Sequence, residues 1–155
     1  MSAVQTAPPT VTASDADSAA LPARCVVVLA DDLPPGLAAN AAAVLALSLG
    51  AAVPHLPGAD VVDADGTVHP GLIPIGFPVL KAPREELREL RARARETDGV
   101  AVIDFPAPGQ RTTNYDEFRA AVAQTPVAEL DYVGVLVHGD KKPVNKLTGS
   151  YALLR

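Results

Sequence analysis

Three long apolar runs, each bounded by turn residues, constrain the fold more than any other feature of this sequence. The runs are RCVVVLA (24–30), GVAVIDF (99–105) and ELDYVGVLVH (129–138), and all three are rich in β-branched residues. Continuous runs of this kind are typical of strands buried on both faces of a sheet. Segments with helical character lie between them, so strands and helices alternate. The pattern predicts an α/β three-layer sandwich, with a mixed, mostly parallel sheet of four to five strands and helices on both faces.

The segments between these runs carry the signals of helices and turns. Residues 35–49 are apolar on every side and stop before Gly50, which is typical of a helix enclosed in a core. Residues 83–96 begin with proline and carry one apolar stripe among charges, which predicts a helix with one solvent-facing side. The other expected elements are a hairpin over 60–70 about Asp65-Gly66, an extended edge segment over 71–82, a helix over 115–125, a basic loop over 139–146 and a final strand over 149–155.

Composition and charge indicate a soluble, cytoplasmic protein of ordinary globular type. The chain has 155 residues, of which 48% are hydrophobic, and its net charge of −5 disfavours nonspecific binding of nucleic acid. Residues 1–22 have too little apolar mass to fold and lack a secretory signal, so we expect a disordered tail before a single domain over 23–155. The apolar helix is too short to span a bilayer, so no membrane contact is expected.

No motif indicates a metal or a cofactor. His55, His69 and His138 are the only histidines, and no two of them have a metal-ligand spacing. Cys25 is the only cysteine, and its place at the start of an apolar strand favours a buried, unreactive thiol. The turn DDLPPGLAAN (31–40) lacks the glycine patterns of nucleotide-binding loops, and its aspartates would repel a phosphate.

The first candidate site is the segment PGQRTTNY (108–115), which joins a strand to a helix. Ligands of α/β sheets tend to bind at the carboxyl ends of strands, where we expect this segment. Arg111 has no capping role at a helix N-terminus, where a positive charge is unfavourable, so a bound anion would account for it. Thr112 and Thr113 would assist, with the alternative that Thr113 or Asn114 serves only as the helix cap.

The second candidate site is the basic segment HGDKKPVNKLTGS (138–150) of an otherwise acidic chain. Lysine runs usually form solvated loops, but the accompanying amide and hydroxyl groups add donors suited to a carboxylate, a phosphate or a carbonyl. The candidate ligand-binding residues in this segment are His138, Lys141, Lys142, Asn145, Lys146 and Thr148.

Several motifs carry a family resemblance. The stretches VVVLADDLPPGLAANAAAV, HPGLIPIGFPVLKA, GQRTTNY and VNKLTGSYALLR resemble an uncharacterised bacterial domain-of-unknown-function family with a peptidyl-tRNA hydrolase type II-like fold. Asp32-Leu33, Ala38-Ala39-Asn40 and residues 145–149 are similar to motifs of the type II hydrolases themselves. The resemblance implies this fold, a homodimer and possible contact with tRNA. The loop 34–36 has no lysine where those enzymes carry a catalytic one.

Three functions remain open at this point. A hydrolase or acyl-transfer enzyme acting on an aminoacyl-, peptidyl- or amide-like substrate would use Asn40 to orient the carbonyl and Asp32 or Asp104 as the base. Arg111 and a lysine of 141–146 would then hold an anion. A noncatalytic module would instead bind a small anionic or amino-acid-like ligand through the two candidate segments. The third alternative is a dimeric structural protein whose lysines are simply solvated.

Overall fold

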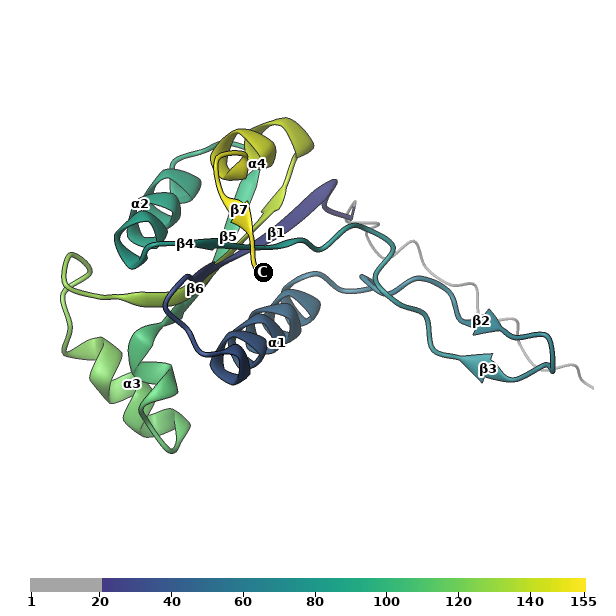
Figure 1. Cartoon of the computed structure of the whole chain (residues 1–155), viewed down its shortest axis with the longest axis horizontal. Helices are drawn as coiled ribbons and strands as arrows, with labels where there is room; N and C mark the ends of the chain where they lie inside the picture. The colour runs from purple at the N-terminus through teal and green to yellow at the C-terminus, as the bar shows by residue number, and fades with distance from the viewer. Residues whose placement is uncertain (1–20) are drawn as a thin grey trace, which may run out of the picture.

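Five strands form one mixed sheet with a helical layer on each side (Figure 1). The structure, a computed structural model, describes residues 21–155, so nearly all of the tail expected over 1–22 lies outside the described residues. The α/β class, the two helical layers and the number of strands agree with the prediction. Across the sheet, the strands follow the order β5 (Val100–Pro106), β6 (Tyr132–Gly139), β1 (Arg24–Ala30), β4 (Val79–Ala82) and β7 (Ala152–Leu153).

The directions of the strands correct the prediction of a mostly parallel sheet. Only one pair of neighbouring strands, β1 and β4, is parallel, whereas β6 is antiparallel to both of its neighbours and β7 is antiparallel to β4. The reason lies in the connection from β5 to β6. It contains a short 3-10 helix (η1, Ala107–Gln110) and α3 (Tyr115–Ala123), and it turns back at one end of the sheet (Figure 1). A connection that does not cross over the sheet leaves neighbouring strands antiparallel.

Helix α1 (Pro35–Ala52) covers one face of the sheet, and α2 (Arg84–Arg95) and α4 (Lys141–Thr148) cover the other. Successive residues of a strand face opposite layers. In β1, Val27 and Leu29 pack with residues of α1, while Val26 and Val28 pack with residues of α2 and α4. The central strand therefore contributes to both halves of the core.

Two helical segments differ from their predicted form. Residues 141–148 form α4 and not a basic loop, because Pro143 stands in the first helical turn, where its missing N–H has no intrahelical partner. Val144 and Leu147 of α4 are buried, so packing on the sheet stabilises the helix. Helix α1 is enclosed on one face only, and much of its other apolar surface is exposed; its buried residues are Ala38, Ala41, Leu45 and Leu49.

Length and composition alone would also let α1 cross a membrane, and it is the one helix of residues 21–155 for which this holds. Its buried face, however, packs in the same core as Val27 and Leu29 of the sheet. A core helix of a folded domain passes the same test, so the structure accounts for α1 by its place on the sheet.

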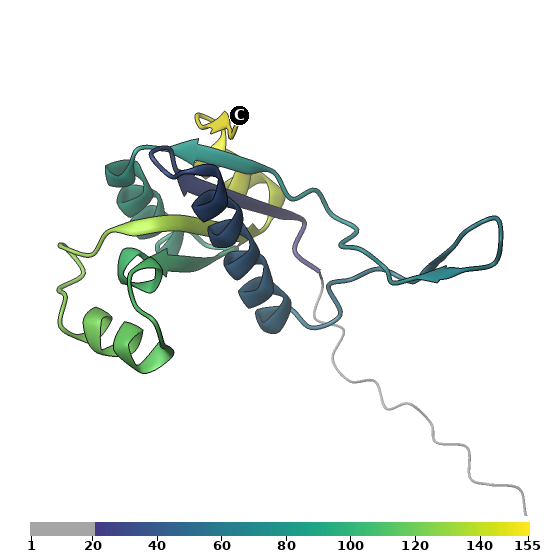
Figure 2. The same ribbon diagram turned by 60° about the horizontal axis from the view of Figure 1, so that its bottom comes forward.

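The hairpin predicted about Asp65-Gly66 is present as β2 (Val61–Val62) and β3 (Val68–His69). Gly66 adopts a φ of 84°, a left-handed conformation that glycine tolerates best. The hairpin does not pack on the body, and Figure 2 shows it projecting away from both helical layers. All residues of 57–70 are exposed, so this segment adds nothing to the core.

Candidate functional site

At one end of the sheet, charged residues that directly follow one strand or precede another in the sequence lie close together. The strand β1 ends beside the end of β4, since Ala30 pairs with Ala82, and β5 ends beside the start of β6, since Pro106 pairs with Tyr132. A cleft of about 400 Å³ opens at this end, which we call the edge cleft. It is lined by Asp32, Leu33, Pro34, Leu37, Arg84, Ala107, Gln110, Arg111, Asp131 and Val133.

Two ion pairs anchor helix α2 at the edge cleft. The Nε of Arg84 donates to Oδ2 of Asp32 at 2.7 Å, and Nη2 of Arg88 donates to Oδ1 of Asp131 at 2.7 Å. Each of these two contacts uses one carboxylate oxygen and one guanidinium nitrogen. Within residues 21–155 neither carboxylate and no other nitrogen of Arg84 forms a further ion pair, so the other oxygens and the Nη groups of Arg84 can contact a molecule in the cleft.

The hydrogen bond from Arg84 also sets the charge of Asp32. It lowers the pKa of this carboxyl below its usual range and outweighs the opposite effect of partial desolvation. A carboxylate with a lowered pKa is a poor proton acceptor near neutral pH. Asp32 is thus better suited to holding a positive group than to acting as a general base.

Arg111 reaches the same cleft from the segment after η1. It is exposed, and among residues 21–155 no carboxylate lies within ion-pair distance of it. The neighbouring Gln110 donates from Nε2 to the carbonyl oxygen of Leu37 at 3.3 Å, which links this segment to α1. The edge cleft therefore contains a positive charge with no acidic partner in the described part of the chain.

The residues after Arg111 build the start of α3. The Oδ1 of Asn114 accepts from the backbone N–H of Glu117 at 2.9 Å, so Asn114 is the helix cap. Both the N–H and the hydroxyl of Thr113 donate to Oε2 of Glu117, and the Thr112 hydroxyl donates to the carbonyl oxygen of Pro108. These contacts give Thr112 and Thr113 local structural roles. They give no such role to the Arg111 side chain.

The three residues proposed for catalysis are not brought together. The Asp104 side chain bonds to Nε of Arg91 from α2, and the Arg91 guanidinium lies over the Tyr132 ring, 5.2 Å from its centroid. Asn40 is exposed on α1 and does not line the edge cleft. Asp32 alone of the three reaches the cleft.

The second candidate segment lies at the opposite end of the sheet. His138 pairs with Cys25 at the start of β1, roughly 20 Å along the strands from Asp32. Burial lowers the pKa of His138 and so favours the neutral form of its ring. Thr148 is buried and its hydroxyl donates to the carbonyl oxygen of Val144 at 2.9 Å. The exposed polar residues of α4 are Lys141, Lys142, Asn145 and Lys146.

Arg84 and Asp131 are cleft residues that sequence reasoning missed. Arg84 is the first residue of α2, where a positive charge is unfavourable for the helix dipole. The same signal singled out Arg111, so it could have found Arg84 as well. Within residues 21–155, no group of three or more histidine, cysteine or acidic side chains is placed to hold a metal ion.

Comparison with known proteins places the chain in a family. Residues 23–155 match the family described as protein of unknown function, DUF2000. The chain belongs to the DUF2000 family. A solved structure of a protein of unknown function from Agrobacterium tumefaciens is similar to this DUF2000 protein, with a TM-score of 0.77 and 23% identity over 85% of this chain and 97% of that one. This likeness shows a shared fold, and no curated protein matches the chain.

Proposed function

We propose that this DUF2000 protein binds a small amino-acid-like ligand in the edge cleft, as a binding module and not as an enzyme. The observation that carries the proposal is the exposed Arg111, which lines a cleft together with the Arg84–Asp32 pair and with Asp131. A ligand with both a carboxylate and an ammonium group complements such a mixed set of charges.

The charges of the cleft suggest how the ligand would lie. The guanidinium of Arg111 and the Nη groups of Arg84 would hold its carboxylate, since a guanidinium matches carboxylate geometry with two parallel hydrogen bonds. The second carboxylate oxygens of Asp32 and Asp131 would accept from its ammonium group. The apolar wall, which includes Leu37, would contact its side chain.

Three features argue against hydrolysis or acyl transfer at this cleft. Asn40 does not line the cleft, Asp32 has a lowered pKa, and residues 34–36 carry no lysine. A peptidyl-tRNA hydrolase type II-like fold stays part of the proposal on the strength of the sequence motifs. We expect no turnover of N-acyl-aminoacyl-tRNA in an assay run beside a type II hydrolase. Turnover comparable to that enzyme would refute the noncatalytic function.

Binding is tested by thermal shift and titration calorimetry with neutral amino acids, their N-acetyl forms and their carboxamides. We expect a free amino acid to raise the melting temperature, and each blocked form to bind more weakly because one charge is lost. R111A and D131N should weaken binding about tenfold or more, since each removes a charged hydrogen bond. R119A, which removes an exposed arginine of α3 outside the cleft, is the matched control. An absence of stabilisation by every compound, or equal weakening by R119A, would overturn the proposal.

A further inference from the structure

The outward face of α1 is an apolar surface that nothing in residues 21–155 covers. Val44 and Leu47 are exposed on it beside Asn40, and Leu47 keeps 76% of its surface accessible. From residue 33 to residue 59 the sequence contains no aspartate, glutamate, lysine or arginine. An exposed helical face that carries leucine and valine and no charge is typical of an interaction surface.

The projecting hairpin is a second such surface. We call residues 58–72 the arm. Its two legs are joined at the base, where the N–H of Gly58 donates to the carbonyl oxygen of Leu72 at 2.8 Å. A Cβ at Gly71 would lie 1.9 Å from the carbonyl oxygen of Gly58, so glycine is needed for the legs to meet. The arm is thus a built element and not a loose loop.

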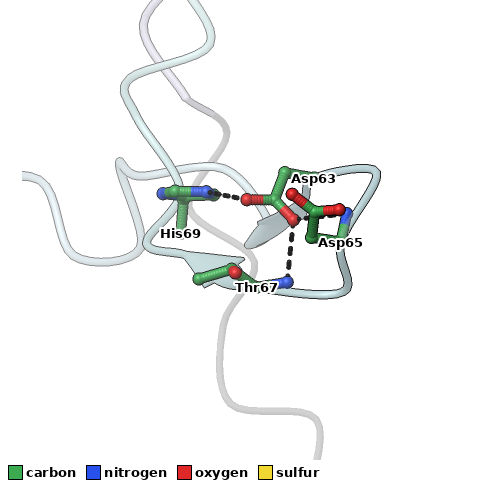
Figure 3. Close-up of polar contacts among 4 residues, drawn as sticks. All are labelled: Asp63, Asp65, Thr67 and His69. Atoms are coloured by element: carbon green, nitrogen blue, oxygen red, sulfur yellow. Dashed lines mark hydrogen bonds and ion pairs between the residues drawn. The ribbon is translucent and has the colours of Figure 1, made fainter.

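A polar network fixes the tip of the arm, as Figure 3 shows. The Oδ1 of Asp63 accepts from the backbone N–H groups of Asp65 and Thr67 at 2.9 Å. The Oδ2 of Asp63 lies 3.1 Å from Nε2 of His69. These contacts lower the pKa of Asp63, the largest effect being the hydrogen bond from Thr67. They use side chains of one face of the hairpin.

The other face of the arm is apolar. Val62 and Val68 are cross-strand partners, and partners in a hairpin point to the same side. They are 63% and 60% exposed, although valine in a strand normally packs on something. A two-stranded hairpin is marginal by itself in water. The arm therefore has an exposed face of two valines that no residue of 21–155 covers.

We propose that two copies of this chain form a dimer in which the Val62–Val68 face of each arm packs on the outward face of the other copy's α1. The dimensions match, because seven residues of an arm leg span about 23 Å and the 18 residues of α1 span about 27 Å. The arm follows α1 directly in the chain, so a two-fold axis near their junction places each arm on the partner helix.

The chemistry of the two surfaces favours a second copy over a membrane. Helices that lie on membranes carry lysine and arginine on their polar side, and α1 has neither. The arm adds Asp60, Asp63 and Asp65, which an anionic lipid surface would repel. The two uncovered apolar surfaces of the chain are similar in length. Both become buried when one copy of the chain packs against a second copy.

The experiment measures the mass of the full chain by analytical ultracentrifugation over a range of concentrations. We expect a dimer, and L47E and V62E should each raise the dissociation constant about tenfold or more, because each buries a charge in an apolar contact. V127E changes an exposed valine outside both surfaces and should leave the dimer unchanged. All three positions are exposed, so none of these variants disturbs the core.

Mixing the variants tests which surfaces meet. An L47E copy and a V62E copy together restore one intact arm-to-helix contact, so the mixture should dimerise more tightly than either variant alone. Helix-to-helix and arm-to-arm contacts would give no such gain. A monomeric wild-type chain at every concentration would overturn the proposal, as would equal loss in V127E. Capture of a monomeric chain by phosphatidylcholine–phosphatidylglycerol vesicles, lost in L47E, would assign the surface to a membrane instead.

Discussion

Removal of the Asp104 carboxylate should destabilise the protein and leave ligand binding intact. In the pair between Asp104 and Arg91, the side chains are 24% and 17% exposed, so the pair is largely shielded from water. Exposed ion pairs contribute about 0–1 kcal/mol, and breaking a fully buried pair costs about 3–5 kcal/mol. The burial here lies between the two cases, so D104A should lower the free energy of unfolding by about 2 kcal/mol.

Urea unfolding of the wild type, D104A, R91A and the double variant isolates the pair. We expect a coupling energy of about 1–2 kcal/mol between the two positions, as for other groups in direct contact. R91A alone should cost somewhat more than D104A, because it also removes the cation–π contact with Tyr132. The melting temperature of D104A should fall by about 8 °C, since 1 kcal/mol corresponds to about 4 °C in a domain of this size.

The same proteins separate a structural from a catalytic role of Asp104. D104A should bind the edge-cleft ligand with the affinity of the wild type, because the Asp104 side chain faces Arg91 of α2 and does not line that cleft. Unchanged stability together with lost binding or lost turnover would refute the reasoning.

Three further outcomes are expected from buried or paired groups. The Tyr132 hydroxyl is buried with no hydrogen-bond partner in the described chain, and a buried polar group without a partner costs about 1–3 kcal/mol. Y132F should therefore raise the free energy of unfolding, measured by calorimetry, by about 1 kcal/mol. Burial lowers the pKa of His138, so the unfolded chain binds more protons than the folded chain, and the free energy of unfolding should fall as pH drops below about 6.5. Urea unfolding at pH 7 and pH 5 should show a weaker pH dependence for H138Q than for the wild type. R84A should raise the pKa of Asp32 back toward 3.8, as followed by carbon NMR of the carboxyl group, and an unchanged titration would contradict the role given to Arg84.

Much of the fold could be predicted because the burial of a strand, or of one face of a helix, produces a local pattern of apolar residues in the sequence. The β-branched run over 24–30 became β1 with the predicted bounds, and the leucine stripe of 83–96 became α2. Strand direction was not predictable, because it depends on whether the β5–β6 connection crosses the sheet, and no residue of that segment encodes this locally. The helix over 141–148 was missed because lysines and a proline outweighed Val144 and Leu147 in the sequence pattern.

The candidate site was predictable in part. Asp32 and Arg111 both follow strands, and the structure brings both to the edge cleft. The pairing of Asp104 with Arg91 depends on which face of β5 the carboxylate takes, and this is set by the register with β6. A charge beside a strand end looks the same in sequence whether it meets a ligand or a neighbouring helix.

The two edges of the sheet have a consequence for how this protein meets others. The edge strand β7 has only two residues, and the edge strand β5 carries Asp104 paired inward and ends at Pro106, which has no N–H to donate. Short strands, inward charges and proline all discourage an incoming strand from adding to a sheet. Peptides that bind by extending a sheet, and fibrils that grow the same way, therefore find little template here. Association with other molecules therefore depends on contacts between side chains, and such contacts can be selective and reversible.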